Sequence, residues 1–363
     1  MKPKVLILQH EISRYNSPIY SLIAKDVDLT LGYFKKDASD GEVNYAKHRF
    51  ETRNLWKFVW LKGMFSYCKN FDVVIFDCNP VCLSMFLIPF VCRKFKAVPW
   101  TIGVRASYKR RYVLPFPKKG LYYRLMNAVF RKSDAVVFYM GDPIPYWVTK
   151  RLPKEKFFVA HNTVQVIEEG IDWEKPRTSI TFVGSLYAEK KADELVRAYL
   201  EAIAGFDAAQ VPQLEIVGDG ALRNDLEALV REKGMQDKVI FHGGVFEETR
   251  LRDIFSRTLV SISPDQAGLS VLKSMGYGVP FVTRHDAITG GERLNIQDGS
   301  NGYLYHSYED LVSLIRESIQ SPEKFLQLGR NARAYYEKNA TPQNMANGFL
   351  NAITYALKSK KQQ

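Results

Sequence analysis

Residues 263–282 carry the side chains and turns most suited to chemistry, and that chemistry is anion binding. An alternating β-branched stretch, 259–263, predicts a buried strand before them, and Gly268 opens a short helix with apolar residues on one face. The turn leaves backbone N–H groups free, and the positive end of the helix dipole points the same way. The stretch therefore predicts an anion site; the alternative is a βαβ unit that only packs a core.

The rest of the chain must position this stretch, and it alternates strands with helices. Expected strands occupy 4–9, 27–33, 71–76, 98–102, 135–139, 157–160, 179–183, 214–217, 239–241, 259–263 and 279–282. Such alternation predicts an α/β fold with parallel, doubly wound sheets. The 363 residues suit two domains. We expect domains at 1–165 and 176–341, a polar linker between them, and a helix with a polar tail at 342–363.

Ligands of doubly wound sheets bind at the carboxyl ends of the strands. In the first half, the residues expected at these ends are His10, Glu11, Arg14, Gly103, Arg105, Met140, Gly141 and Asp142. Of these, His10, Arg14, Gly103 and Arg105 are the candidates for recognising an acceptor substrate. Each of them could equally be an ordinary loop residue.

Positive charge is concentrated in the first half of the chain. Residues 1–160 hold 28 Lys and Arg against 12 Asp and Glu, whereas the remainder holds 23 against 27, within a total of +12. The most basic segment, 105–124, interleaves aromatic residues with Lys109, Arg110, Arg111, Lys118 and Lys119. This composition favours an anionic membrane surface. Single-stranded nucleic acid and a solvated loop are the alternatives, and no nucleic-acid motif accompanies the segment.

Residues 263–282 resemble the signature of the retaining GT-B glycosyltransferases, the "group 1" family that uses nucleotide-sugar donors. The matching residues are Asp265, Gly268, Leu269, Gly278, Val279 and Pro280. Lys273 stands where the family has a glutamate. Upstream, Gly184, Leu186 and Lys190 resemble the family's diphosphate loop, although Ser185 replaces its arginine. The Gly218-Asp219-Gly220 triplet, the stretch 239–243 and Asn162 resemble further family motifs.

The resemblance implies two Rossmann-like domains facing each other across a cleft, with the C-terminal helix crossing back to the first domain. It implies catalytic roles for Lys190 and Asp265. The donor-binding residues it implies are Gly184, Ser185, Leu186, Lys190, Gly218, Gly243, Asp265, Gly268, Leu269, Ser270, Lys273 and Glu292. A departing diphosphate needs positive charge and N–H donors, so we expect no metal and no cofactor besides the donor co-substrate.

Two of these residues leave alternatives open. Asp265 could bond hydroxyl groups of the transferred sugar, or it could cap the following helix. Lys273 could bring its ammonium to the diphosphate and replace the missing arginine, or it could point into solvent.

We therefore expect a cytoplasmic glycosyltransferase, peripheral on the inner face of the membrane, that retains the anomeric configuration. Its acceptor would be a lipid-linked or surface glycan, as in lipopolysaccharide, capsule or exopolysaccharide synthesis, with no nucleic-acid partner. A GT-B-like protein that binds a nucleotide or glycan without catalysis is the alternative. A dinucleotide-dependent oxidoreductase is disfavoured because no glycine motif follows the first strand. The four cysteines are expected to be buried free thiols.

Overall fold

The computed structural model describes residues 1–39, 42–91, 94–104, 120–167, 169, 172 and 174–359. These residues form two compact units. The first unit combines residues from 1–104, 120–163 and 341–359, and the second contains residues from 164–340. The predicted basic residues Arg105, Lys109, Arg110, Arg111, Lys118 and Lys119 lie outside the described residues.

The first unit is built on a parallel sheet with the strand order β3-β2-β1-β6-β7-β8-β9. Its strands are β1 (Lys4–Leu8), β2 (Asp28–Tyr33), β3 (Ala46–Arg49), β6 (Val73–Asp77), β7 (Lys96–Thr101), β8 (Val136–Phe138) and β9 (Phe157–Val159). Its helices are α1 (Ser17–Ile23), α2 (Met64–Cys68), α3 (Leu83–Phe86), α4 (Gly120–Lys132), α5 (Ile144–Trp147) and α12 (Pro342–Lys358). Because helices cover both faces, the central strands are continuous apolar runs.

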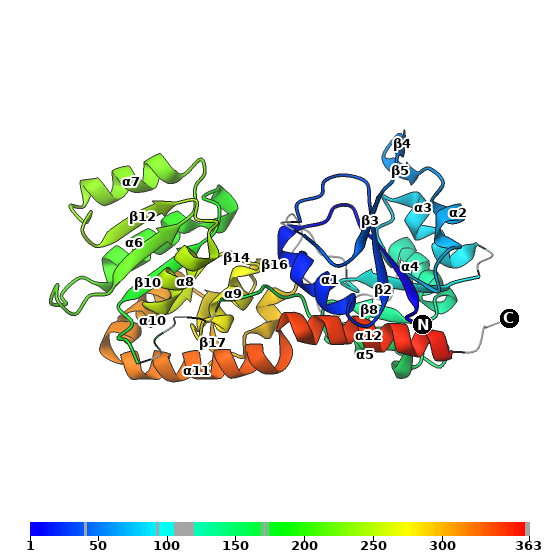
Figure 1. Cartoon of the computed structure of the whole chain (residues 1–363). Helices are drawn as coiled ribbons and strands as arrows, with labels where there is room; N and C mark the ends of the chain where they lie inside the picture. Colours follow the sequence, from blue (N-terminus) through cyan, green and yellow to red (C-terminus); the bar gives the residue numbers. More distant parts are fainter. Residues whose placement is uncertain are drawn as a thin grey trace. The chain divides into compact units, whose positions relative to one another are not determined.

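The last helix, α12, belongs to the first unit although it ends the chain (Figure 1). Its residues Met345, Phe349 and Ile353 are buried in the same core as Val5 and Ile7 of β1. This arrangement confirms the predicted crossing of the C-terminal helix back to the first domain.

The second unit repeats the plan with a parallel sheet ordered β12-β11-β10-β13-β15-β17. The strands are β10 (Ser179–Val183), β11 (Gln213–Val217), β12 (Val239–Gly243), β13 (Thr258–Ile262), β15 (Phe281–Arg284) and β17 (Gly302–Tyr305). The helices are α6 (Ala192–Ala202), α7 (Arg223–Glu232), α8 (Glu248–Ser256), α9 (Ser270–Gly276), α10 (Tyr308–Gln320) and α11 (Pro322–Asn339). In both sheets the first strand lies near the centre, and the order in which the chain adds strands reverses beside it, as in Rossmann folds.

Two small sheets add to the main ones. In the first unit, β4 (Thr52–Leu55) and β5 (Phe58–Leu61) form an antiparallel hairpin. In the second unit, β14 (Gln266–Ala267) pairs with β16 (Ile288–Thr289), directly after Asp265. The sequence patterns had not predicted either of these pairs.

Candidate functional site

Two loops meet closely at the carboxyl edge of the second sheet. The amide of Leu186, after β10, donates to the carbonyl of Asp219, after β11, at 2.8 Å. Gly218 has a φ of +150°, and a Cβ there would lie 1.8 Å from the carbonyl oxygen of Gly184. Gly220, with a φ of +154°, approaches the backbone of Leu186 in the same way. Glycines are therefore required here for backbone packing, which gives the Gly-Asp-Gly motif a structural reason.

Lys190 ends the short 3-10 helix η4 (Ala188–Lys190), and its side chain folds back over this turn. A Cβ on Gly184 would lie 3.3 Å from Lys190 Nζ, so the ammonium lies beside the Gly184 turn. Lys190 is only 8% exposed. Burial lowers the pKa of Lys190 to about 8, while the negative charge of Glu292 acts in the opposite direction. Among the described residues, the ammonium has no hydrogen bond or ion pair. A buried cation held in this way favours an anionic ligand.

Glu292 lies at the start of another 3-10 helix, η5 (Glu292–Asn295), and it is 8% exposed. Its carboxylate accepts hydrogen bonds from the amide of Gly290 at 3.0 Å and from the Thr289 hydroxyl at 3.2 Å. These contacts fix the loop after β16. The carboxylate thus shapes the loop and contributes negative charge near Lys190.

Asp265 is 5% exposed and forms an ion pair with Arg284 of β15. It does not cap a helix: α9 begins at Ser270, and its N-cap residue is Leu269, which makes no side-chain capping bond. The capping alternative is therefore wrong. The neighbouring Gln266 accepts a hydrogen bond from the Tyr187 hydroxyl. This bond joins the Asp265 turn to the loop that carries Lys190.

The start of α9 leaves room for a ligand at Gly268. A Cβ on that residue would meet no heavy atom within 4 Å among the described residues. Leu269 and Ser270 follow it, half-buried.

The ammonium of Lys273 takes neither of the two positions expected from the sequence. Its Nζ donates to the carbonyl of Gln165 at 2.9 Å and forms an ion pair with Glu248 of α8. The side chain is 12% exposed, so it does not point freely into solvent. Its charge is already balanced by Glu248, so it offers no spare cation in place of the missing arginine.

The other predicted donor residues occupy the same edge of the second sheet. Ser185 is exposed, Leu186 is fully buried, and Gly243 has a φ of +69° beside Arg223. Leu186 therefore supplies packing, and its amide holds the Asp219 loop, whereas the Ser185 side chain faces solvent. Among the described residues, no group of three or more His, Cys, Asp or Glu side chains is placed to hold a metal ion.

In the first unit, His10 and Asp77 come together at the carboxyl ends of the neighbouring strands β1 and β6. His10 Nδ1 lies 2.8 Å from Asp77 Oδ2. The His10 carbonyl accepts from the amides of Phe34 and Lys35, and its ring packs 5.1 Å from the Phe34 ring. Within the described chain His10 has no further polar partner. In a neutral imidazole whose Nδ1–H donates to a carboxylate, Nε2 is the hydrogen-bond acceptor.

The other two described acceptor candidates contribute differently. Gly103 has a φ of +77°, and a Cβ there would lie 2.6 Å from the Phe138 ring. Close packing against Phe138 therefore explains why this position is a glycine. Arg14 begins the short helix η1 (Arg14–Asn16) and is exposed.

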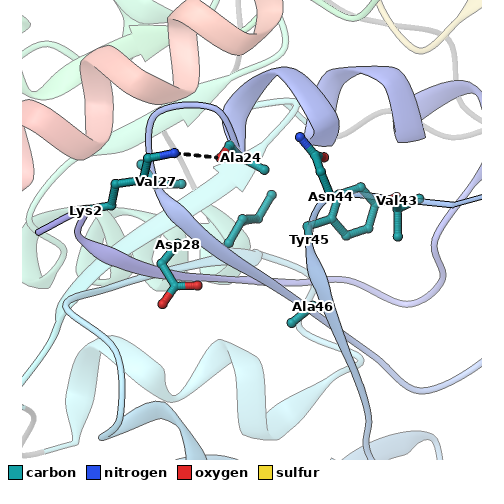
Figure 2. A pocket seen from close by; sticks show the side chains of 9 residues that line it. Lys2, Ala24, Val27, Asp28, Val43, Asn44, Tyr45 and Ala46 are labelled. Carbon is teal, nitrogen blue, oxygen red and sulfur yellow. Dashed lines mark hydrogen bonds between the residues drawn. The ribbon is translucent and has the colours of Figure 1, made fainter.

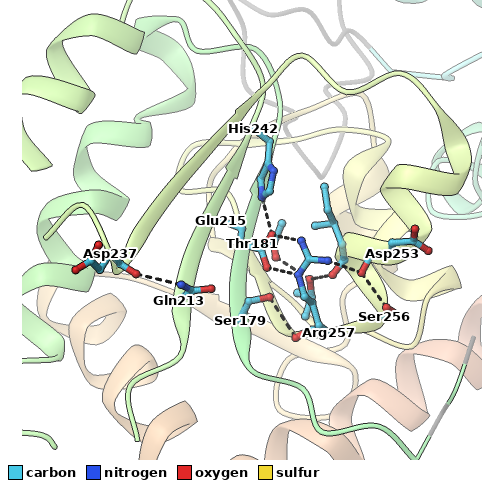
Figure 3. Close-up of polar contacts among 11 residues, drawn as sticks. Ser179, Thr181, Gln213, Glu215, Asp237, His242, Asp253, Ser256 and Arg257 are labelled. Atoms are coloured by element: carbon cyan, nitrogen blue, oxygen red, sulfur yellow. Dashed lines mark hydrogen bonds and ion pairs between the residues drawn. The ribbon is translucent and has the colours of Figure 1, made fainter. Parts of the chain in front are cut away.

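One polar network escaped the sequence analysis (Figure 3). Glu215 of β11 is 2% exposed, and both of its oxygens accept from Arg257, at 2.7 and 2.6 Å, while His242 Nε2 lies 2.7 Å away. Burial alone would raise the pKa of Glu215, but the hydrogen bonds from His242 and Arg257 lower it to about 2. Because the carboxylate is saturated by these partners, the network stabilises the sheet rather than binding substrate.

A pocket of about 470 Å³ in the first unit lies at the other end of its sheet (Figure 2). Its lining includes Asp28 and Ala46, the first residues of β2 and β3, and Lys2, which donates to the Ala24 carbonyl at 3.4 Å. Substrates of doubly wound sheets bind at the carboxyl ends. This pocket is therefore separate from the candidate residues.

The described cysteines agree with the sequence-based expectation. Cys68, Cys78 and Cys82 are free and buried, and burial raises the pKa of each thiol. They pack the core of the first unit. In the described part of the chain, no helix has the length and apolar character needed to cross a membrane.

Comparison with known proteins gives one family and several partial relatives. Residues 165–335 match the family of glycosyl transferases group 1. An alpha-D-kanosaminyltransferase of Streptomyces kanamyceticus is 28% identical over 161 residues, which is 43% of this chain and 40% of that protein. An alpha-monoglucosyldiacylglycerol synthase of Streptococcus pneumoniae is 30% identical over 135 residues, 36% of this chain and 29% of the relative. The chain thus matches less than half the length of these relatives.

Solved structures cover nearly the whole chain. HepE of Anabaena in complex with UDP has a TM-score of 0.67 and 14% identity over 97% of this chain and 99% of its own. The lipopolysaccharide outer core galactosyltransferase WaaB, in its apo form, has a TM-score of 0.65 and 17% identity with the same coverage. At these identities the likeness establishes the fold, and the predicted GT-B fold class is confirmed.

Proposed function

We propose that this protein, whose residues 165–335 match the family of glycosyl transferases group 1, transfers a sugar from a nucleotide-sugar donor to a glycan or lipid-linked acceptor. The observation that carries the proposal is the buried Lys190, whose ammonium lies beside the Gly184 turn without a hydrogen bond or ion pair among the described residues, although the charge of Glu292 acts on it. A nucleoside diphosphate would supply an anion in direct contact with this ammonium. The amide of Ser185 and the start of α9 at Ser270 complete its binding site, while the amides of Gly184 and Leu186 hold the turn by donating to the carbonyls of Val217 and Asp219.

The chemistry follows from the charge on the leaving group. As the bond between sugar and phosphate breaks, negative charge grows on the diphosphate. A preorganised cation and N–H donors stabilise that charge most in a site with little water. Asp265, held by Arg284, bonds hydroxyl groups of the transferred sugar. The anomeric configuration is retained, no metal is required, and the acceptor belongs to a cell-surface polysaccharide.

The proposal is tested by incubating the purified protein with a panel of nucleotide sugars and measuring the released nucleotide. Turnover of one donor supports the transferase and rules out a binding protein without activity. Binding of nucleotides without turnover of any donor, with a range of glycan and lipid acceptors present, would favour that alternative. NMR of the product reports whether the configuration is retained.

We assign His10 to the acceptor, since its Nε2 can accept a hydrogen bond from the attacking hydroxyl group. His10→Ala should reduce transfer to the acceptor about a hundredfold, within the range for positioned proton acceptors. Slow hydrolysis of the donor, which needs no acceptor, should stay unchanged. If hydrolysis and transfer fall equally, His10 acts on the donor or on folding. Asp77→Asn should give a smaller loss of the same kind.

We also propose that the protein works at the inner face of the membrane, with the basic segment 105–124 contacting anionic lipid. Each lysine or arginine near such a surface contributes about 1 kcal/mol, and salt weakens the effect. Replacing Lys109, Arg110 and Arg111 with serine should reduce co-sedimentation with anionic vesicles. Equal binding to neutral vesicles, or no change in the variant, would count against this role.

A further inference from the structure

The hairpin β4–β5 has one face against its own unit and one face open. Leu61 is 1% exposed, and its amide donates to the Ser84 hydroxyl at 3.1 Å. On the same face, Val59 is half-buried, and its amide donates to the carbonyl of Val81 at 2.9 Å. Because side chains alternate along a strand, the cross-strand pair Leu55 and Phe58 belongs to the opposite face.

The turn and the part of that opposite face next to it are apolar and exposed, whereas Trp60, further along the face, is half-buried with its ring 5.8 Å from that of Phe65. Leu55 is 37% exposed, Phe58 is 40% exposed, and Trp56 in the turn is 85% exposed. Figure 1 shows the hairpin at the top of the first unit, above α3. A cluster of large apolar side chains at a projecting turn is costly in water, and such patches indicate a contact with another surface.

The backbone of the turn strengthens this argument. Trp56 has a φ of +57°, the left-handed region, in a two-residue hairpin turn. Turns of this kind favour glycine or asparagine, and a bulky side chain there is strained. Strained residues of this sort occur where function requires a particular side chain. Folding alone would select a different residue at this position.

The charges around the turn identify the surface that it fits. Arg49, Arg53, Lys57 and Lys62 lie in residues 49–62, where Glu51 is the one acidic residue. That acid is paired with Lys62 at 3.0 Å. Lys57 Nζ lies 4.5 Å from the centre of the Trp56 ring. Cations around an aromatic tip match an anionic lipid surface, where indole rings settle at the headgroups.

We propose that the hairpin tip, formed by Arg53, Leu55, Trp56, Lys57 and Phe58, inserts into the headgroup region of an anionic lipid bilayer. This inference rests on the proposed membrane association and names the element that provides apolar insertion. Lysine and arginine stems extend along the apolar surface while their charged ends stay with the headgroups. The hairpin thus adds a short-range apolar contact to the long-range attraction of the basic first half.

The test compares the full-length protein with its Trp56→Gly variant on vesicles of phosphatidylglycerol and phosphatidylcholine. Glycine suits the positive φ, so the variant should fold with equal or higher thermal stability. Its partition onto the vesicles should fall about tenfold, the loss expected for one large buried apolar side chain. Brominated acyl chains should quench tryptophan fluorescence in the wild type and much less in the variant. Phe246→Ser, which removes a 78% exposed aromatic residue of the second unit, is the matched control and should bind as wild type.

The outcomes separate this inference from the proposals on which it rests. Unchanged partition of Trp56→Gly, with binding lost in the Lys109, Arg110 and Arg111 variant, would overturn the hairpin's role and preserve membrane association. No binding of the wild type to any vesicle would overturn both, while nucleotide release would still test the transferase. Concentration-dependent dimers that Trp56→Gly abolishes in lipid-free solution would assign the tip to contacts between copies and overturn the lipid proposal.

Discussion

Replacing Lys190 with methionine should raise the stability of the protein at pH 7 and lower kcat/KM for transfer about ten- to a hundredfold. The loss of rate follows from one charge-assisted hydrogen bond to the diphosphate, worth about 1.5–3 kcal/mol. The gain in stability follows from burial, which holds the pKa of Lys190 at about 8 instead of 10.5. This difference corresponds to a cost on the order of 3 kcal/mol for the charged, folded state.

The sign of the pH dependence is fixed by that lowered pKa. Below pH 8 both folded and unfolded chains carry the proton, so the cost is fully present. Between pH 8 and pH 10.5 the folded protein loses its proton first, and stability relative to the variant recovers. Thermal unfolding of wild type and Lys190→Met at pH 7 and pH 10 measures this. A variant that is less stable at pH 7, or that keeps full kcat/KM, would contradict the role of Lys190.

Glu215→Gln should destabilise the second unit by about 3 kcal/mol, because it removes the buried charge that binds Arg257 and His242. The loss lies at the low end for a broken ion pair, since the Arg257 side chain is 40% exposed and keeps its bond to the carbonyl of Asp253. The pKa of Glu215 is lowered to about 2. Its contribution is therefore present above pH 4.5 and is lost as the pH falls through about 2.

Denaturant unfolding of the Glu215→Gln variant measures this loss. The matched control is Glu227→Gln, which breaks a pair with Arg223 on the surface helix α7; both side chains are about one-third exposed, and the paired atoms are 2.9 Å apart. Exposed pairs of this kind contribute less than about 1 kcal/mol. Equal effects of the two substitutions would show that the Glu215 network adds little to the fold. The kcat/KM of the folded Glu215 variant should match the wild type.

The sequence predicted most strands of the main sheets because these strands are buried on both faces and read as short apolar runs. It missed β17 and the mostly exposed edge strand β3. β10 was expected at 179–183, and the strand has these bounds. The place of α12 came from the family resemblance, since periodicity alone cannot say which sheet a helix covers. The hairpin β4–β5 was missed because its turn, Trp56-Lys57, has none of the glycine or asparagine that signals such turns.

The sequence indicated which loops carry the candidate site residues, but it did not indicate which partners their side chains contact. Lys190 and Asp265 belong to loops that touch through Tyr187 and Gln266. The loops meet because β10 and β13 are neighbouring parallel strands, an order that the sequence did not predict. The partners of charged side chains depend on tertiary packing. Lys273 pairs with Glu248 of a different helix, and Asp265 pairs with Arg284 of the next main strand. No local spacing rule indicates these pairs, so the capping role of Asp265 was a wrong alternative.

Proton uptake on binding a nucleoside diphosphate tests the central claim most directly. Isothermal titration of UDP, GDP and ADP at pH 8, in two buffers of different ionisation enthalpy, measures the protons taken up. Lys190 is about half protonated at that pH in the free protein, so binding beside the diphosphate should take up about half a proton more than in Lys190→Met. Equal proton uptake by the two proteins, or no binding of any diphosphate, would contradict a donor site built around Lys190.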